Sequence, residues 1–524
     1  MDNHPADKVI NIDSMRYTDV LAMLCFHIHQ LPSKEQETLY TETVNSYDKY
    51  YKQAIKRYPF LNKPQLDWKV DTRISDLLML AEDKSIAISA IILGAIGVLD
   101  STLDLTVKAG GDVPVYLTGR ECPTDIEDFP SKSYYRITAL NSNTAEYGLV
   151  LPKIYCSWTK ESARTIKNVA HDPLTIALKN LLWVPNCDNW NVSNLFCDFR
   201  GVGFKVGDKK NTRDNDNAPQ AQSLKIVSSP LDWQAPFTTT LDWNTEKFYL
   251  SYFTDNDQRL EMRIKEVIKY AIHQRAEIVC FPEMMGTEAL IKECKEIISG
   301  YSDCINGPEV YPKLFFLPTR EYIQNGQWYN RLDILDDTGK CIFHYFKKHP
   351  FTFDEKIGED NSRINIKFEE PIFPDNKICV IHVPEIGRIG VIICADVFKD
   401  NYLQFLMRDL QLTLLIFPVY TKGRDLMERS LAEAHKYSCD VLLCNTCAAW
   451  DPKFHPQDES NPSNGFPHDF ISVYYPYGHR FPDKQVAELK CTTETCTGCA
   501  FLTVIAPRYD DPSVQPAQKT LGGI

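Results

Sequence analysis

Short apolar segments alternate with helical ones along the C-terminal part of this 524-residue chain. Residues 258–274 carry apolar side chains at helical spacing, which predicts an amphipathic helix, and the apolar segment 277–281 follows directly. Residues 426–437 are typical of a helix. Further segments are typical of short strands, namely 314–318, 331–335, 341–346, 379–383, 390–394, 412–417 and 441–445. Strands that alternate with helices predict an α/β domain built in layers.

The residues before this part follow a different pattern. Residues 14 to about 110 predict mainly helices, including a polar one over 33–57 and a strongly apolar one within 74–105. The apolar run 86–99 is shorter than the ~20 residues needed to cross a bilayer, so we expect it to be a buried helix. Residues 112–206 mix short strand-like and helical segments.

A polar stretch without periodicity, residues 207–223, is typical of a linker. It predicts two domains. Residues 1–222 would form a mainly helical domain with some strands, to which the sequence assigns no function. Residues 223–524 would form the α/β domain.

Composition excludes several classes of protein. The 57 Lys and Arg residues are outnumbered by 70 Asp and Glu, and the net charge of -13 argues against binding nucleic acid or an anionic membrane through overall charge. The 17 cysteines are too sparse for a disulfide scaffold. The first residues do not have the pattern of a secretory signal. We expect a cytoplasmic protein with reduced thiols and no membrane partner, whose C-terminal domain does not bind nucleic acid.

Three predicted strands end in residues that could carry chemistry: Glu283, the pair Lys347 and Lys348, and Cys394. Sites in α/β folds are commonly built at such strand ends. A thiol near a helix N-terminus is favoured as the thiolate. A buried carboxylate can accept its proton, and an ammonium can stabilise an oxyanion. Together these groups suit acyl transfer.

In their chain order these residues resemble the Glu-Lys-Cys triad of the nitrilase, or carbon–nitrogen hydrolase, superfamily. Phe281-Pro282-Glu283 matches the motif of the base. Tyr345-x-Lys347-x-His349 matches the lysine motif and selects Lys347 over Lys348, and Gly390-x-x-x-Cys394-x-Asp396 matches the nucleophile motif. The resemblance covers about residues 235–510. It implies an α/β fold with a four-layer αββα sandwich, preceded here by the mainly helical α+β N-terminal domain.

Other positions extend the resemblance, among them Asn330, the turn Asp337-Thr338-Gly339, Asn445 and Ser472. Many members have a second glutamate after the lysine that positions substrate and lysine. The resemblance suggests Glu355 for this role, with Glu359 as the alternative. Two features depart from the family. Ala395 follows the nucleophile where a bulky aromatic is usual, and the long charged stretch 352–374 predicts an additional loop near the mouth of the site.

The resemblance implies a thiol hydrolase that cleaves a non-peptide carbon–nitrogen bond in a small molecule, an amide rather than a nitrile, through a thioester. Cys394 would attack, Glu283 would shuttle protons, Lys347 would stabilise the oxyanion and Glu355 would orient the lysine. No metal ion and no organic cofactor are expected. The resemblance also makes a homo-oligomer plausible, as a dimer or larger, and transfer of the acyl group to an acceptor other than water stays open.

A second hypothesis treats the C-terminal domain as an oligomerising scaffold in a regulatory or defence-associated protein, with the N-terminal domain binding a partner. In that case Cys394 would be a core residue and Lys347 a strand-end lysine with a solvated ammonium. The pairs Cys444-x-x-Cys447 and Cys496-x-x-Cys499 have the spacing of zinc ligands. Strand alternation, however, places Cys444 and Cys447 on opposite faces, so a zinc site is not favoured.

Overall fold

The computed structural model describes only part of the chain, namely residues 15–62, 74–81, 83–103, 107–109, 134–136, 144–152, 172–185, 190–197, 199, 204–206, 224–253, 257–304, 312–357, 364–383, 386–421, 437, 439–450, 468–475, 487–491, 499–505 and 517–520. The linker predicted at 207–223 lies outside these residues, as do Glu359 and residues 426–436 of a predicted helix.

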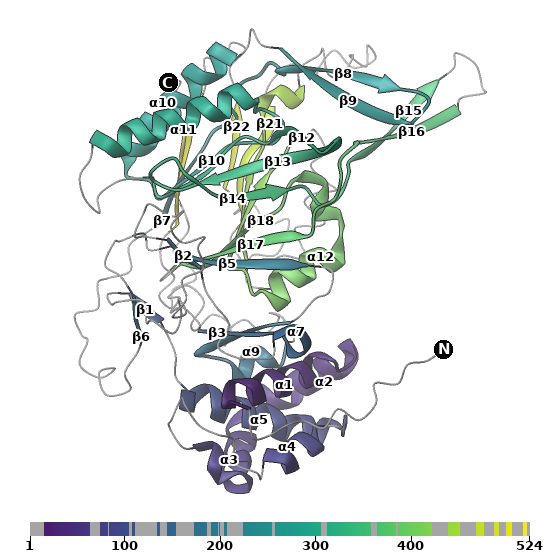
Figure 1. Cartoon of the computed structure of the whole chain (residues 1–524), viewed down its shortest axis with the longest axis vertical. Helices are drawn as coiled ribbons and strands as arrows, with labels where there is room; N and C mark the ends of the chain where they lie inside the picture. Colours follow the sequence, from purple (N-terminus) through teal and green to yellow (C-terminus); the bar gives the residue numbers. More distant parts are fainter. Residues whose placement is uncertain are drawn as a thin grey trace.

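The N-terminal part folds as a small group of helices (Figure 1). Its elements are α1 (Tyr17–His29), α2 (Ser33–Thr43), α3 (Tyr47–Arg57), the 3-10 turn η2 (Pro59–Asn62), α4 (Ile74–Leu80) and α5 (Ile86–Leu103). The helix predicted over 33–57 is interrupted between α2 and α3, where Ser46 leaves the helical conformation with φ -126° and its hydroxyl donates to the carbonyl of Glu42. Serine side chains compete in this way with the helical backbone pattern.

The apolar helix α5 lies at the centre of this helical group. By length and by its mean hydropathy of 2.0 it could cross a membrane, but 67% of its residues are buried in the protein. The backbone of α3 approaches it closely, and a Cβ atom at Gly94 would collide with the carbonyl of Tyr50. Packing of this kind is that of a core helix, as the length of the apolar run predicts.

The C-terminal part contains two large sheets. The first has the order β12 (Arg320–Gln324), β13 (Gln327–Leu335), β11 (Leu314–Phe316), β10 (Ile278–Cys280), β7 (Leu224–Ser228), β23 (Phe501–Ile505), β24 (Ala517–Thr520), with β14 (Cys341–Phe346) also paired to β13. The second has the order β2 (Tyr134–Arg136), β5 (Asn191–Cys197), β17 (Lys377–Val383), β18 (Gly387–Val391), β19 (Leu414–Pro418), β20 (Asp440–Cys444), β21 (His468–Tyr475), β22 (Ala487–Cys491).

The two sheets pack face to face, and helices cover the outer face of the first. Apolar side chains from both sheets form one core, and the hydroxyls of Ser228 and Ser472 meet across it at 2.9 Å. Helices α10 (Asp257–Gln274) and α11 (Glu288–Cys304) pack on the opposite face of the first sheet (Figure 1). The described residues thus form a helix layer and two sheets. The helix predicted at 426–437, a candidate for the fourth layer of the expected sandwich, falls almost wholly outside them.

The boundary expected between residues 222 and 223 does not separate two independent units. Strand β5 pairs in parallel with β17, from Asn191 opposite Lys377 to Phe196 opposite His382, so residues before the boundary complete the second sheet. The antiparallel pair of β3 (Leu149–Pro152) and β4 (Leu181–Val184) also joins the two cores. Trp183 packs in the helical core and its neighbour Val184 in the core between the sheets, because successive strand residues face opposite ways.

The charged stretch after Lys347 is a hairpin instead of an irregular loop. Strands β15 (Thr352–Ile357) and β16 (Ile364–Glu369) join β9 (Lys247–Tyr252) and β8 (Phe237–Asp242) in a four-stranded sheet at the upper right of Figure 1. The remaining short elements are β1 (Val107–Ala109), α7 (Thr144–Tyr147), α9 (Leu174–Ala177), β6 (Phe204–Val206), η6 (Cys394–Phe398), α12 (Asp400–Gln404), η7 (Phe405–Asp409) and η8 (Cys447–Trp450).

Candidate active site

The three residues expected to act in catalysis converge, and a fourth, Glu370, joins them. Lys347 Nζ lies 2.8 Å from Glu283 Oε1 and 2.7 Å from Glu370 Oε2. The Cys394 thiol lies near the Glu283 carboxylate, which raises the pKa of the thiol. All four residues are buried, with Cys394 4% exposed and Lys347 2% exposed. The arrangement brings a thiol, a carboxylate and an ammonium group together, as the resemblance predicts for a nucleophile, a base and a stabilising cation.

Each of these residues follows the end of a strand. Glu283 comes after β10, Lys347 directly after β14, and Cys394 begins η6 beyond β18. The backbone at two of the turns is left-handed, with φ 61° at Met284 and φ 40° at Cys394. Non-glycine residues rarely adopt this conformation, which commonly marks functional turns.

Asp396 explains why the lysine and cysteine motifs occur together. Its Oδ1 accepts from the backbone N–H groups of Lys348, at 2.8 Å, and His349, at 2.9 Å. Its Oδ2 accepts from the N–H of Ile393, at 3.1 Å, and from the Tyr345 hydroxyl, at 3.4 Å. One buried carboxylate therefore ties the turn at Cys394 to the segment that carries Lys347.

The glutamate that contacts the lysine is Glu370, where the sequence predicted Glu355; the alternative, Glu359, lies outside the described residues. Glu355 belongs to the hairpin, where it pairs with Ile366, and its side chain is not among those described. Glu370 directly follows β16, and its N–H donates to the carbonyl of Phe351 at 2.8 Å. Strand pairing from Thr352 opposite Glu369 to Ile357 opposite Ile364 brings the chain back beside its start, and Glu370 follows directly.

Asn330 links the two glutamates. Its Nδ2 lies 2.9 Å from Glu283 Oε1 and 3.2 Å from Glu370 Oε1. Asn330 is 1% exposed, and its position in β13 is set by pairing with β12 and β14. The amide and the lysine together hold both carboxylates in fixed orientations.

Electrostatics favour a neutral thiol and a charged lysine in the resting site. Burial raises the pKa of Cys394 well above its usual value, and the Glu283 carboxylate raises it further. Burial alone would lower the pKa of Lys347, but Glu283 and Glu370 raise it well above its usual value. Burial raises the pKa of Glu283, which Lys347 partly offsets. The thiol proton is therefore held at rest and has an acceptor beside it.

A third carboxylate, Glu321, was not expected from the sequence. It lies opposite Asn330 in the β12–β13 pair, so the two side chains share a face of the sheet. Its Oε1 accepts from the N–H of Leu250 at 3.3 Å, and burial raises its pKa to about 7. No local motif distinguishes this glutamate, since only strand pairing brings it to the site.

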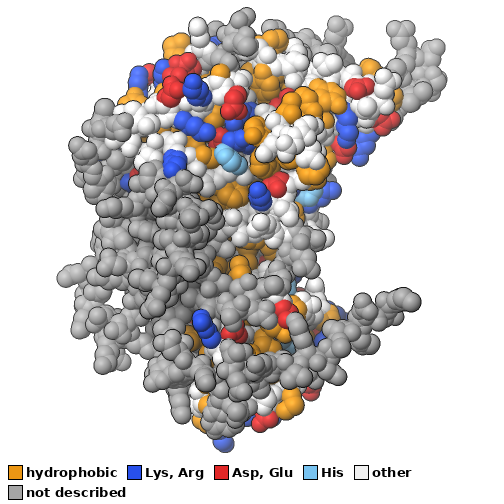
Figure 2. Space-filling view, in the orientation of Figure 1, with side chains coloured by type: hydrophobic (Ala, Val, Ile, Leu, Met, Phe, Trp, Pro, Cys, Tyr) orange, Lys and Arg blue, Asp and Glu red, His pale blue; other side chains and the backbone are white. Residues whose placement is uncertain are grey.

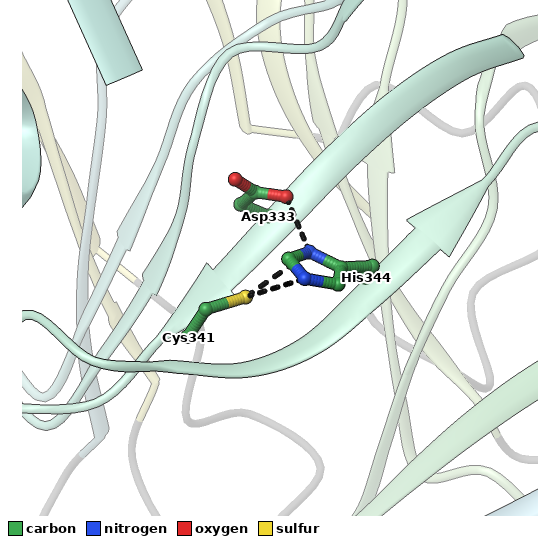
Figure 3. A group of neighbouring side chains, drawn as sticks. All are labelled: Asp333, Cys341 and His344. Carbon is green, nitrogen blue, oxygen red and sulfur yellow. Dashed lines mark hydrogen bonds and ion pairs between the residues drawn. The ribbon is translucent and has the colours of Figure 1, made fainter. Parts of the chain in front are cut away.

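Within the described residues, one group of side chains could hold a metal ion: Asp333, Cys341 and His344, whose donor atoms lie within 4.8 Å of one another (Figure 3). Asp333 is already neutralised by Arg331 at 2.6 Å, Arg320 at 3.4 Å and Lys295 at 3.5 Å. Burial raises the pKa of Cys341 to about 12, which opposes the thiolate that a metal needs. The charges therefore disfavour a metal here.

The cysteine pairs with the spacing of zinc ligands show no sign of a zinc site in the described residues. Cys444 Sγ lies 3.7 Å from the carbonyl oxygen of Ser229 and 3.8 Å from that of Cys280, so its thiol donates to the backbone. Cys496 lies outside the described residues.

No protein-family model and no curated protein matches this sequence. Members of the nitrilase superfamily are among its structural neighbours. Nit3 of Saccharomyces cerevisiae is 17% identical over 55% of this chain and 92% of Nit3, with a TM-score of 0.31. A mutant amidase from Nesterenkonia sp. AN1, with the acetamide moiety of fluoroacetamide added to its active-site cysteine, is 13% identical over 55% of this chain and 92% of the amidase, with a TM-score of 0.33. The C. elegans NitFhit protein is 16% identical over 58% of this chain and 61% of that protein, with a TM-score of 0.29.

Proposed function

We propose that this protein is a thiol hydrolase that cleaves the carbon–nitrogen bond of a small-molecule amide. The observation that carries the proposal is the position of Lys347, held between Glu283 and Glu370 at 2.8 and 2.7 Å beside the Cys394 thiol. A cation fixed by two carboxylates next to a nucleophile is suited to stabilising an oxyanion.

In the first half of the reaction, the Cys394 sulfur attacks the amide carbon and its proton passes to Glu283. The carbonyl electrons move to the oxygen, whose negative charge the Lys347 ammonium stabilises. Glu283 then gives the proton to the nitrogen. The carbon–nitrogen bond breaks, the amine or ammonia leaves, and a thioester remains on Cys394.

In the second half, water replaces the amine. Glu283 takes a proton from water as the water oxygen bonds to the thioester carbon, and Lys347 again stabilises the oxyanion. The carbon–sulfur bond breaks, and the proton returns to the sulfur. Glu370 and Asn330 act as positioning residues throughout, because they hold Lys347 and Glu283 by hydrogen bonds.

The choice of an amide rests on the motif resemblance, and the choice of a small molecule rests on burial. Glu283 and Lys347 are each 2% exposed, which leaves little room for a peptide backbone at the reacting groups. We further propose that the protein works as a homo-oligomer in the cytoplasm, as the sequence predicts.

The test is covalent labelling of the full chain with a small haloacetamide, followed by intact-mass and peptide analysis. We expect one rapid addition, at Cys394, that an excess of a substrate amide slows. Cys394→Ala should lose the rapid addition. Cys499→Ala, a change at a half-buried cysteine, should keep it.

Slow addition spread over several cysteines, unchanged in Cys394→Ala, would refute the mechanism and favour the scaffold hypothesis. If Glu283→Gln shows the same rapid addition at Cys394 as the unchanged protein, Glu283 is not the base.

A further inference from the structure

A cavity of about 520 Å³ opens where the edges of the two main sheets meet. Strands β12, β13 and β14 of the first sheet and β5 and β17 of the second provide its walls. Its volume is within the range of small-molecule sites, roughly 300–1,000 Å³. The proposed reaction makes no use of this cavity.

The cavity and the catalytic groups lie on opposite faces of β13. Asn330 points to Glu283 and Glu370, at 2.9 and 3.2 Å, whereas the next residue, Arg331, lines the cavity. Successive side chains of a strand face opposite ways, so the two sites share a strand but not a chamber.

The cationic side chains of Arg331 and Lys377 line the cavity. His344 is also among its walls, and none of its lining residues in the described part of the chain is acidic. The nearby carboxylate, Asp333, is fully buried and is shared by Arg331, Arg320 and Lys295. Figure 2 shows basic and histidine side chains among hydrophobic ones on the front face of the upper part of the molecule.

Arg331 is held in place and keeps a donor available. Its Nε and Nη2 bind Asp333 at 2.6 and 3.2 Å, and the residue is 8% exposed. Its Nη1 makes no hydrogen bond to the described residues. The exposed ammonium of Lys377 likewise pairs with no carboxylate of the described residues. A fixed guanidinium donor with a second cation nearby suits a phosphate or carboxylate group.

Aromatic side chains form another wall. Tyr322 and Phe346 line the cavity with ring centroids 6.3 Å apart, and the Arg331 guanidinium lies 4.3 Å from the Tyr322 ring centroid. Phe343 lines it as well. Such walls favour a flat apolar group, because rings pack against rings and against a guanidinium plane.

We propose that this cavity binds a small-molecule anion that carries a planar ring. The anionic group lies at Arg331 and Lys377, and the ring packs against Tyr322 and Phe346. A phosphate and a carboxylate share the chemistry that these cations recognise.

The test is isothermal titration calorimetry of the full chain with phenylphosphonate and, separately, with benzoate. Comparing the two ligands shows whether the cavity prefers a phosphonate or a carboxylate group. We expect at least one of them to bind with one-to-one stoichiometry. Methylphosphonate, acetate and benzyl alcohol, which carry only one half of the recognised chemistry, should bind at least tenfold more weakly.

Lys377→Glu should weaken binding about tenfold or more, since it reverses a charge at the cavity wall. Lys292→Glu is the matched control, because Lys292 is an exposed lysine on α11 that does not line the cavity, and the change in net charge is the same. It should leave binding within twofold. The proposal fails if neither ring-bearing anion binds, if Lys377→Glu binds as tightly as the unchanged protein, or if the two variants weaken binding equally.

Discussion

The helical N-terminal region and the two-sheet region both bury polar side chains, but they use them differently. In the helical region such side chains serve the backbone: the Asp100 carboxylate accepts from the N–H groups of Lys179, Asn180 and Leu181, and Gln36 donates to the carbonyls of His29 and Leu31. In the two-sheet region, Glu283, Lys347 and Glu370 contact one another. At the candidate site, buried charged groups therefore contact one another instead of the backbone.

The largest effect is expected where this difference is greatest. Lys347→Met leaves Glu283 and Glu370 buried together without their cation, which should lower the free energy of unfolding by about 3–5 kcal/mol at pH 7. The loss should shrink in acid, as the carboxylates take up protons. Urea unfolding at pH 7 and pH 5 measures the loss of stability and its dependence on pH, with the exposed Lys292→Met as control. An equal loss for both variants would erase the distinction between the two regions.

Asp100→Ala tests the helical side of the comparison. The change removes the acceptor of three backbone N–H groups at 2.8–3.0 Å and should cost about 3 kcal/mol. Asp100→Asn, which keeps one acceptor oxygen, should cost less. Thermal unfolding gives the loss, and labelling of Cys394 below the unfolding temperature should proceed at the unchanged rate. Slower labelling in the folded variant would show that this carboxylate also supports the site.

Glu321 should make stability depend on pH. Its pKa in the folded protein is about 7, above the usual value of 4.5, so the folded state holds more protons than the unfolded state between these values. The contribution of Glu321 to the free energy of unfolding is therefore complete below about pH 4.5 and is lost as pH rises through 7. Allowing for partial exposure, the loss is about 1–3 kcal/mol. Glu321→Gln should flatten the pH profile measured by urea unfolding, and an unchanged profile would contradict the shift.

The smallest effect concerns the contact between the sheets. Ser228→Ala or Ser472→Ala leaves one buried hydroxyl without its partner and should cost about 1 kcal/mol. The double variant should cost less than the sum, because no unsatisfied hydroxyl remains. Denaturant unfolding of the unchanged protein, the two single variants and the double variant completes a double-mutant cycle. Additive losses would mean that the two hydroxyls do not depend on each other.

Much of the site could be predicted because its residues follow strands that the sequence marks clearly. Glu283, Lys347 and Cys394 each end an apolar segment, and apolar segments of this kind are recognisable without knowledge of their partners. Glu370 could not be selected in the same way. Thr352 pairs with Glu369, so the ends of the hairpin meet whatever its length, and distance along the chain from Lys347 does not indicate which glutamate returns.

The sequence by itself indicated several strands and the helix near 258–274 of the C-terminal part, and the order in which Glu283, Lys347 and Cys394 follow strand ends. These are local properties, set by side-chain periodicity within a few residues. The tertiary structure alone decided that β5 completes the second sheet, that Glu370 holds the lysine, and that Asp396 joins the two motif turns. The physical reason is that hydrogen bonds and ion pairs depend on distance in space, which the pairing of distant strands creates.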